Sequence, residues 1–321
     1  MLMNYSFSSA ESWQALMTAH EIDIEITQTS KGVYSLGISS LFLPTLRINK
    51  SVQNKKITSI IHGILNENEF LITVPLDQRY TKTNGVEILS GGFNILAPRE
   101  TVHIVNSVNS SKSTLNIGIP EASLERYLDQ EKVAYITNNA VSIRTQIYQS
   151  QEFYHAQKEM AVYIDNILSH PINYNLQALL DIEDTLYAYI VSLMTKCIKG
   201  QHVQNQPFNK RLAIVKRAIE YIDSSSLLHI SIPTILQHTF CSVRSLEYAF
   251  NNILGTSPKR YLILRRMHLI KKQLLSNPEY KIKDIVSQYG IVNLGRFAHD
   301  FNTLFGEYPK NLMLKQLNPN L

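Results

Sequence analysis

The C-terminal third of the chain carries a surplus of cations whose types suit contact with phosphate. Residues 206–321 hold 16 lysines and arginines against 7 acidic residues, a net charge of +9, whereas residues 1–205 carry −4. Such cations neutralise a nucleic-acid backbone without reading its sequence. The phosphate-contact candidates are Ser242, Lys259, Arg260, Lys271, Lys272 and Lys310. This asymmetry is typical of a nucleic-acid-binding module carried by a second domain, although charge alone also fits an ordinary solvated surface.

Side chains that bind metals or catalyse reactions are scattered along the sequence. His62, His103 and His170 belong to no His-x-His pair, and Cys197 and Cys241 cannot make a four-ligand zinc site. One set shares a face of an expected helix: Glu152, His155 and Glu159. No second element supplies further ligands, so a solvated helix face is favoured over a metal site. We expect no catalytic residue, no metal and no cofactor.

The elements that must position the cations follow from a pattern that occurs twice, 51 residues apart. The copies read Leu246-x3-Phe250-x3-Leu254-Gly255-x2-Pro258 and Phe297-x3-Phe301-x3-Phe305-Gly306-x2-Pro309. Apolar residues four apart share one helix face, the glycine suits a left-handed helix end, and the proline suits the next helix's first turn. Each copy predicts a helix-turn-helix unit, and two joined units make a two-pronged reader of the major groove.

Helix boundaries can be placed around both copies. Ser231 is expected to cap the first helix of unit one, with Pro233 in its first turn. The other expected helices are 211–223, Val243–Leu254, 258–275, 281–289, Leu294–Phe305 and a short one after Pro309. The basic helix 258–275 is the connector, and its length should hold the two recognition helices roughly 34 Å, one DNA turn, apart.

Residues 210–315 resemble the DNA-binding domain of the AraC/XylS family of bacterial transcription regulators. The residues that carry the resemblance are Ser242-x-Arg244-x-Leu246-x3-Phe250, Leu254-Gly255-Thr256-Ser257-Pro258, Tyr261-Leu262-x3-Arg266-Met267, Gly290, Phe297, Phe301, Phe305-Gly306 and Pro309. The departures from the family pattern are Leu236, Phe240, Val286 and Ile291. All four are apolar, so they predict a repacked core rather than a lost fold.

The resemblance implies which side chains face DNA bases. These are Arg244, Glu247 and Tyr248 on the first recognition helix, and Leu294, Gly295, Arg296 and His299 on the second. A guanidinium pairs with O6 and N7 of guanine, worth roughly 1–3 kcal/mol of discrimination, so the two arginines are the strongest candidates. Leu294 and Gly295 are poor hydrogen-bonders, which predicts less direct readout by the second unit. A solvated surface residue is the alternative for each position.

The N-terminal region predicts a different architecture, so the whole chain is expected to be α+β. Residues 20–120 alternate short β-branched runs with turn residues, which predicts a β-sandwich or small barrel. Helical spacing over 143–168 and 174–196 predicts an antiparallel helix pair, and the polar stretch 199–209 predicts a linker. Residues 1–198 are similar, more weakly, to the cupin-like effector and dimerisation domains of this family, and lean towards its ethanolamine-regulator type.

The resemblance implies a transcriptional regulator, an activator controlled by a small-molecule effector and acting with RNA polymerase, and not an enzyme. A homodimer is expected through an apolar stripe containing Leu186, Ile190 and Leu193. A cytoplasmic protein is expected, since no signal peptide or membrane-spanning run is seen. The alternatives are control by a protein partner, an architectural DNA binder that senses nothing, and a metal-dependent cupin enzyme fused to a DNA-binding domain.

Overall fold

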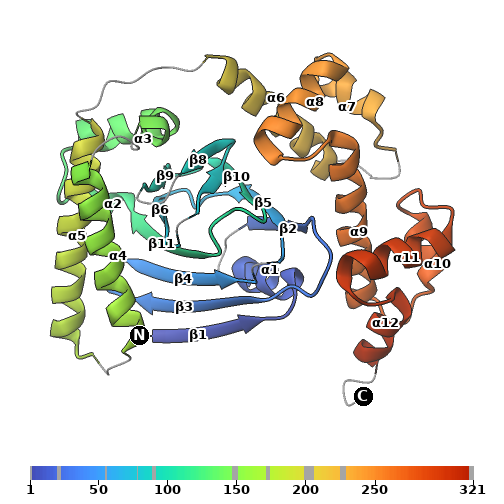
Figure 1. Cartoon of the computed structure of the whole chain (residues 1–321), viewed down its shortest axis with the longest axis horizontal. Coiled ribbons are helices and arrows are strands. Elements are labelled where there is room, and N and C mark those ends of the chain that lie inside the picture. The colour runs from blue at the N-terminus through green and yellow to red at the C-terminus, as the bar shows by residue number, and fades with distance from the viewer. Residues whose placement is uncertain are drawn as a thin grey trace.

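A computed structural model describes residues 2–19, 23–54, 56–77, 79–88, 92–146, 151–170, 174–198, 206–224 and 229–317. Two β-sheets with flanking helices come first, and an all-helical part follows, as the sequence predicts (Figure 1). The fold class is therefore α+β. Helices α4 and α5 lie at one end of the sheets, and helices α9 to α12 lie at the other (Figure 1). Nowhere in the described part is a helix long and apolar enough to cross a membrane.

The sheets form an open sandwich rather than a closed barrel. The six-stranded sheet has the order β1-β3-β4-β11-β6-β9, and the five-stranded sheet has the order β2-β5-β10-β7-β8. The strands are β1 (Leu2–Phe7), β2 (Asp23–Gln28), β3 (Leu36–Phe42), β4 (Arg47–Gln53), β5 (Ser59–Ile64), β6 (Glu69–Pro75), β7 (Thr81–Thr83), β8 (Val86–Ile88), β9 (Asn94–Leu96), β10 (Thr101–Asn106) and β11 (Ser113–Pro120). The edge strand β1 lies outside residues 20–120, for which strands were predicted; Met3, Tyr5 and Phe7 alternate in it with Asn4 and Ser6, and none of its residues is fully buried.

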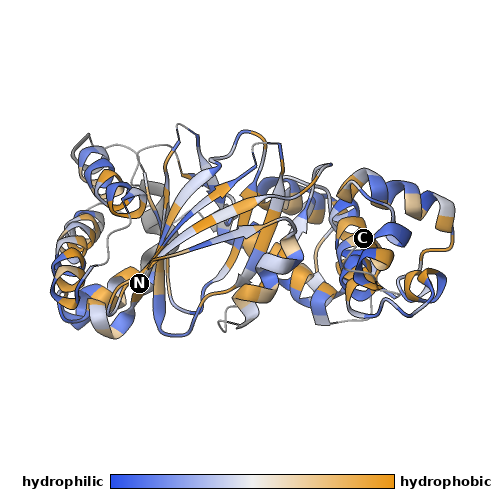
Figure 2. Cartoon of the chain, turned by 90° about the horizontal axis from the view of Figure 1, so that it is seen from below, coloured by the Kyte–Doolittle hydropathy of each residue, from blue (hydrophilic) through white to orange (hydrophobic). Residues whose placement is uncertain are grey.

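Five helices pack against the sheets outside the C-terminal helical part. Helix α1 (Ala10–Ala19) lies between β1 and β2 near the N-terminus. The others are α2 (Glu121–Leu124), α3 (Gln130–Gln146), α4 (Gln151–Ser169) and α5 (Leu176–Ile198). The predicted helix 143–168 is thus corrected: its start belongs to α3, its main part is α4, and 147–150 lie outside the described residues. At the end of the sheets where α4 and α5 lie, the helices carry their hydrophobic and hydrophilic residues on different sides (Figure 2).

The predicted dimer stripe is part of the chain's own core. Leu186, Ile190 and Leu193 on α5 are fully buried in one cluster with sheet residues such as Phe70 and Ile117. A side chain that has lost all contact with solvent inside one chain cannot also line a surface between two chains. The dimer interface predicted from these leucines and isoleucine is therefore wrong, because the stripe was needed to cover the sheet.

The C-terminal helices follow the predicted repeat. They are α6 (Gln206–Ser224), α7 (Ile232–Thr239), α8 (Val243–Leu254), α9 (Pro258–Ser276), α10 (Ile282–Ser287), α11 (Leu294–Phe305) and α12 (Pro309–Leu317). Ser231 caps α7 as expected, and Gly255 and Gly306 end α8 and α11 with φ of 67° and 79°. Helix α6 starts at Gln206, inside the linker predicted for residues 199–209, so the linker is shorter than predicted. Residues 199–205 lie outside the described part.

The first helix-turn-helix unit shares its core with the five-stranded sheet. Leu246, Phe250 and Tyr261 are fully buried in a cluster that also contains Ile60 and Val105 of β5 and β10. The second unit has its own core, built on Phe297, Phe301 and Phe305. The helix-turn-helix part is therefore docked on the sandwich through its first unit and through the connector α9, which contacts β2.

Candidate nucleic-acid interface and internal cavity

Helix α8 presents its predicted base-reading residues to solvent. Arg244, Glu247 and Tyr248 are exposed, while Leu246 and Phe250 are buried on the opposite face. Ser242 caps the helix by accepting a hydrogen bond from the Ser245 amide. The guanidinium carbon of Arg211, from α6, lies 5.3 Å from the centroid of the Tyr248 ring, although that ring stays 59% exposed. This cation–π contact fixes the direction in which Tyr248 leaves the helix.

Helix α11 presents a sparser surface. Arg296 and His299 are exposed, and Asn293 caps the helix by accepting from the Arg296 amide at 2.9 Å. The Arg296 Nε atom lies 3.7 Å from the nearer carboxylate oxygen of Asp300, and the side chain remains 82% exposed. An exposed pair of this kind contributes little, so the guanidinium is available to an outside partner.

Apolar side chains stand uncovered at the starts of both recognition helices, a feature that sequence reasoning did not single out. Val292 is 95% exposed and Leu294 is 37% exposed beside α11, and Val243 is 51% exposed on α8. Phe240, in the turn before α8, is 89% exposed and adopts a left-handed backbone with φ of 52°. A residue other than glycine pays a steric penalty in that conformation.

The predicted phosphate contacts divide into exposed and buried residues. Ser242, Lys259, Arg260, Lys272 and Lys310 are exposed, whereas Lys271 is buried. The Lys271 Nζ atom lies 2.8 Å from Glu11 Oε2 of α1, and 4.5 Å from the centroid of the Phe305 ring. Lys271 cannot reach a phosphate in this arrangement, because the helical period turns it towards the sandwich. Its predicted role is corrected accordingly.

A buried arginine joins the sandwich to the helix-turn-helix part. The two terminal nitrogens of Arg265 on α9 donate to Glu25 of β2 at 2.8 Å and to Asp223 of α6 at 2.7 Å. The other Asp223 oxygen lies 2.9 Å from His62 Nε2 on β5. Burial opposes the charged form of Asp223, but the bonds to His62 and the charge of Arg265 outweigh it, so the pKa of Asp223 is lowered.

Sequence reasoning missed this network. The only local signal was a face of α9 on which Arg265 follows the buried Tyr261 by four residues and His268 follows by three more. Residues at that spacing share one side of a helix, so a buried tyrosine predicts a buried arginine nearby. The partners Glu25 and Asp223 carry no signal of their own, since both are ordinary acidic residues far away in sequence.

Two histidines that looked unrelated in sequence are neighbours across β5 and β10. His62 and His103 are paired in register, with ring centroids 6.2 Å apart. His103 is fully buried, neither ring nitrogen has a hydrogen-bond partner, and burial lowers its pKa to about 3. The described residues contain no group of three side chains able to hold a metal ion, and the Glu152 side chain lies outside them.

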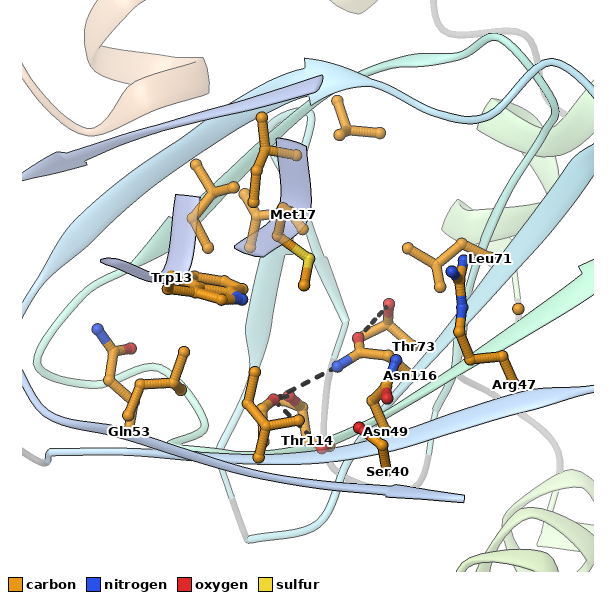
Figure 3. A pocket seen from close by; sticks show the side chains of 18 of the residues that line it. Trp13, Met17, Ser40, Arg47, Asn49, Gln53, Leu71, Thr73, Thr114 and Asn116 are labelled. Carbon is orange, nitrogen blue, oxygen red and sulfur yellow. Dashed lines mark hydrogen bonds between the residues drawn. The ribbon is translucent and has the colours of Figure 1, made fainter. Parts of the chain in front are cut away.

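A cavity of about 220 Å³ lies between the sheets beneath α1. Trp13 and Met17 of α1 line one side, and a row of hydrogen-bonding side chains that includes Asn116, Thr73 and Thr114 lines the other (Figure 3). In that row the Asn116 amide accepts from Thr73 at 3.1 Å and donates to Ser51 at 3.3 Å, and the Ser51 hydroxyl lies 2.7 Å from that of Thr114.

Several polar or charged groups of the cavity wall are buried, and two of them have no hydrogen-bond partner. The Thr81 hydroxyl and the Trp13 indole nitrogen are buried and have no hydrogen-bond partner. Arg47 and Glu69 form a 2.6 Å ion pair on the wall. The Lys112 ammonium donates to two backbone carbonyls, and burial lowers its pKa to about 8. An apolar space with a few unpaired polar groups is the usual setting of a small-molecule site.

Comparison with known proteins finds matches to the region that contains the repeat. A helix-turn-helix domain model matches residues 235–314. The chain is 28% identical over 130 residues to the XylDLEGF operon transcriptional activator of Pseudomonas putida, a match covering 40% of each chain. It is 33% identical over 98 residues to the probable thc operon regulatory protein of Rhodococcus erythropolis, covering 30% of each chain. The matches thus span less than half the length of these relatives.

One solved structure aligns over more of the chain. The crystal structure of the AraC-like transcriptional activator CuxR covers 84% of this chain and 96% of its own, with 13% sequence identity and a TM-score of 0.45.

Proposed function

We propose that this chain, which belongs to the AraC/XylS family of transcription regulators, binds one operator sequence through α8 and α11. The observation that carries the proposal is the matched pair of recognition helices. Each begins after a side-chain cap, buries its repeated apolar residues, and leaves Arg244 or Arg296 exposed within its first turn. Two such helices held on one connector suit two successive major-groove segments of a duplex.

The side chains divide by role. Arg244 and Arg296 read guanine edges, Glu247 accepts from cytosine, and Tyr248 and His299 contact bases or the adjacent backbone. The exposed cations Lys259, Arg260, Lys272 and Lys310, together with the Ser242 hydroxyl, contact phosphates. Phosphate contacts supply affinity that falls with rising salt, whereas base contacts supply preference for one sequence.

The cavity beneath α1 is the proposed effector site, and the protein is proposed to activate transcription together with RNA polymerase. The unpaired Thr81 hydroxyl and Trp13 indole support the presence of a ligand, because a buried polar group without a partner is costly. An effector acts only through different affinities for two arrangements of the protein. Helix α1 contacts both the cavity, through Trp13, and the connector, through Glu11, so a change in its position reaches α9.

Selection of bound duplexes from a random pool, using the full-length chain, tests the function. We expect one enriched motif with two segments about one helical turn apart. Enrichment of A·T-rich DNA without a motif would favour an architectural DNA binder instead. Footprinting on the motif with and without cell metabolites then separates a small-molecule sensor from a regulator controlled by a protein partner.

A homodimer stays part of the proposal, but through a surface other than the one first predicted. Helices α4 and α5 keep exposed apolar residues, including Val162, Leu176 and Leu180. Pairing two chains would raise the effective concentration of the second DNA-binding part at a double site. The mass of the protein in solution at micromolar concentration, measured by light scattering, tests this; a monomer would refute it.

A further inference from the structure

The two recognition helices are built in the same register but differ at one outward position. Both have 12 residues, and their caps, Ser242 and Asn293, lie 51 residues apart like the rest of the repeat. In that register Arg244 corresponds to Gly295, and Tyr248 corresponds to His299. On α11, Gly295 and His299 are four residues apart and both are exposed, so they share the face directed away from the buried Phe297 and Phe301.

Nothing inside the folded chain requires glycine at position 295. A Cβ atom added there would meet only Asn293 Oδ1 at 3.6 Å, which is ordinary contact, and the backbone has no positive φ. Other glycines of the chain differ. At Gly63 an added Cβ would lie 2.2 Å from a backbone oxygen, and Gly306 has φ of 79°.

Glycine in a helix is unfavourable relative to alanine, because the unfolded chain has more freedom to lose. Gly295 therefore carries a stability cost that no contact or backbone angle of the described protein explains. A glycine on the outward face of a recognition helix leaves the backbone uncovered, so that another molecule can approach it closely.

The neighbours of Gly295 indicate what that molecule presents. Leu294 is 37% exposed and Val292 is 95% exposed, so bare backbone is flanked by uncovered apolar side chains. The outward Arg296 and His299 flank the same surface. In the major groove, the group that suits an apolar side chain is the C5-methyl of thymine. Exposed apolar groups beside a cation match a groove that presents a methyl group next to acceptors and phosphates.

We propose that Gly295 is a DNA-contact residue that lets α11 approach its groove more closely than α8 does, and that Leu294 there packs on a thymine methyl group. The inference rests on the proposed DNA-binding function and makes the two units unequal readers. Helix α8 reads its segment through hydrogen bonds from Arg244. Helix α11 reads through close fit, and its segment of the operator contains a thymine that the protein senses through the methyl group.

The first test is Gly295→Ala in the full-length chain, with two readouts. Alanine should raise the melting temperature by about 2 °C, because it favours the helix. The same change should weaken binding to the selected duplex about tenfold, because the added methyl group overpacks a close contact. A merely unoptimised surface position would gain stability and keep its affinity, so unchanged or tighter binding overturns the proposal.

Matched variants separate stability from contact. Ala134→Gly, at an exposed position of α3 far along the chain from the DNA-binding part, should lower the melting temperature and leave DNA affinity unchanged. Arg244→Ala should weaken binding without the gain in melting temperature given by Gly295→Ala. If Ala134→Gly also weakened binding tenfold, a change of helix stability remote from the DNA would alter affinity by itself, and the assignment of the Gly295→Ala loss to a contact at position 295 would be overturned.

The second test replaces each thymine of the selected duplex by uracil, which lacks only the C5-methyl group. We expect a loss of a few-fold at one position in the segment read by α11, and no such loss for Leu294→Ala, whose binding is already weakened there. If no position responds in the wild-type protein, the methyl contact is refuted. Failure of the initial selection to yield any motif would instead refute the proposed function itself, so the two failures are distinguishable.

Discussion

The carboxylate of Glu11 and the ammonium of Lys271 lie 2.8 Å apart, although the two residues are 260 positions apart in sequence. The other Glu11 oxygen lies 3.4 Å from His268, also on α9. The same helix α1 lines the cavity with Trp13 and Met17 (Figure 3). One short N-terminal helix therefore contacts both the internal cavity and the connector between the two helix-turn-helix units.

Removing the Glu11 charge should destabilise the protein in a pH-dependent way. Burial favours the neutral carboxyl, but His268 and Lys271 outweigh it and hold the pKa of Glu11 well below its usual value of 4.5. A carboxyl whose folded pKa is depressed stabilises the fold above its unfolded pKa, and loses this contribution as pH falls further. Glu11→Gln should cost about 3 kcal/mol at pH 7, measured by denaturant unfolding.

The difference between Glu11→Gln and wild type should shrink once pH falls below about 4.5, as the wild-type carboxylate loses its advantage. Glu87→Gln on β8, an exposed carboxylate of the same sandwich, is the control and should change stability little. A pH-independent loss in Glu11→Gln would contradict the assignment to charge.

Substitution of Arg265 should destabilise the protein, even by lysine, which keeps the positive charge. A planar guanidinium reaches Glu25 and Asp223 together, whereas a lysine ammonium is a single point and cannot bridge them in the same way. Arg265→Met leaves the Glu25 carboxylate without its partner and leaves Asp223 with His62 alone, and it should cost about 3–5 kcal/mol in unfolding free energy. Arg260→Met, exposed on the same helix, should change stability by less than about 0.5 kcal/mol.

Lys271 and Lys272 should differ although they are adjacent. Lys272→Ala should lower DNA affinity for all sequences and reduce the slope of log affinity against log salt by about 1, because it removes one phosphate contact. Lys271→Ala should leave that slope unchanged and lower stability, since its ammonium bonds Glu11. Equal salt slopes for the two variants would contradict this division.

Leu186→Ala should act on folding. Leu186 is fully buried against the sheet, so truncation should cost about 2–5 kcal/mol in unfolding free energy. Leu176, 67% exposed on the same helix, gives the control, and Leu176→Ala should have little effect on stability. A Leu186→Ala variant that kept wild-type stability but changed its mass in solution would restore the dimer stripe that the structure removes.

The sequence alone determined the two helix-turn-helix units, because their signals are local. The spacing from Leu246 to Leu254 and from Phe297 to Phe305, with a glycine after each, specifies two helices and their ends without reference to the rest of the chain. Caps such as Ser242 act within one turn. The exposure of Arg244 and Arg296 follows in turn, since they lie on the face opposite these apolar residues.

Only the tertiary structure decided which elements the other helix and strand faces pack against. Lys271 and Lys272 look alike in sequence, but the docking of α9 on the sandwich buries one against Glu11 and leaves the other in solvent. The apolar stripe that contains Leu186 and Leu193 is compatible with a hydrophobic core and with a dimer interface. In the folded chain it packs on the sheet and forms part of the core. His62 and His103 became neighbours only through the register of β5 and β10. Contacts between distant segments depend on how whole elements pack, and no short stretch of sequence contains that information.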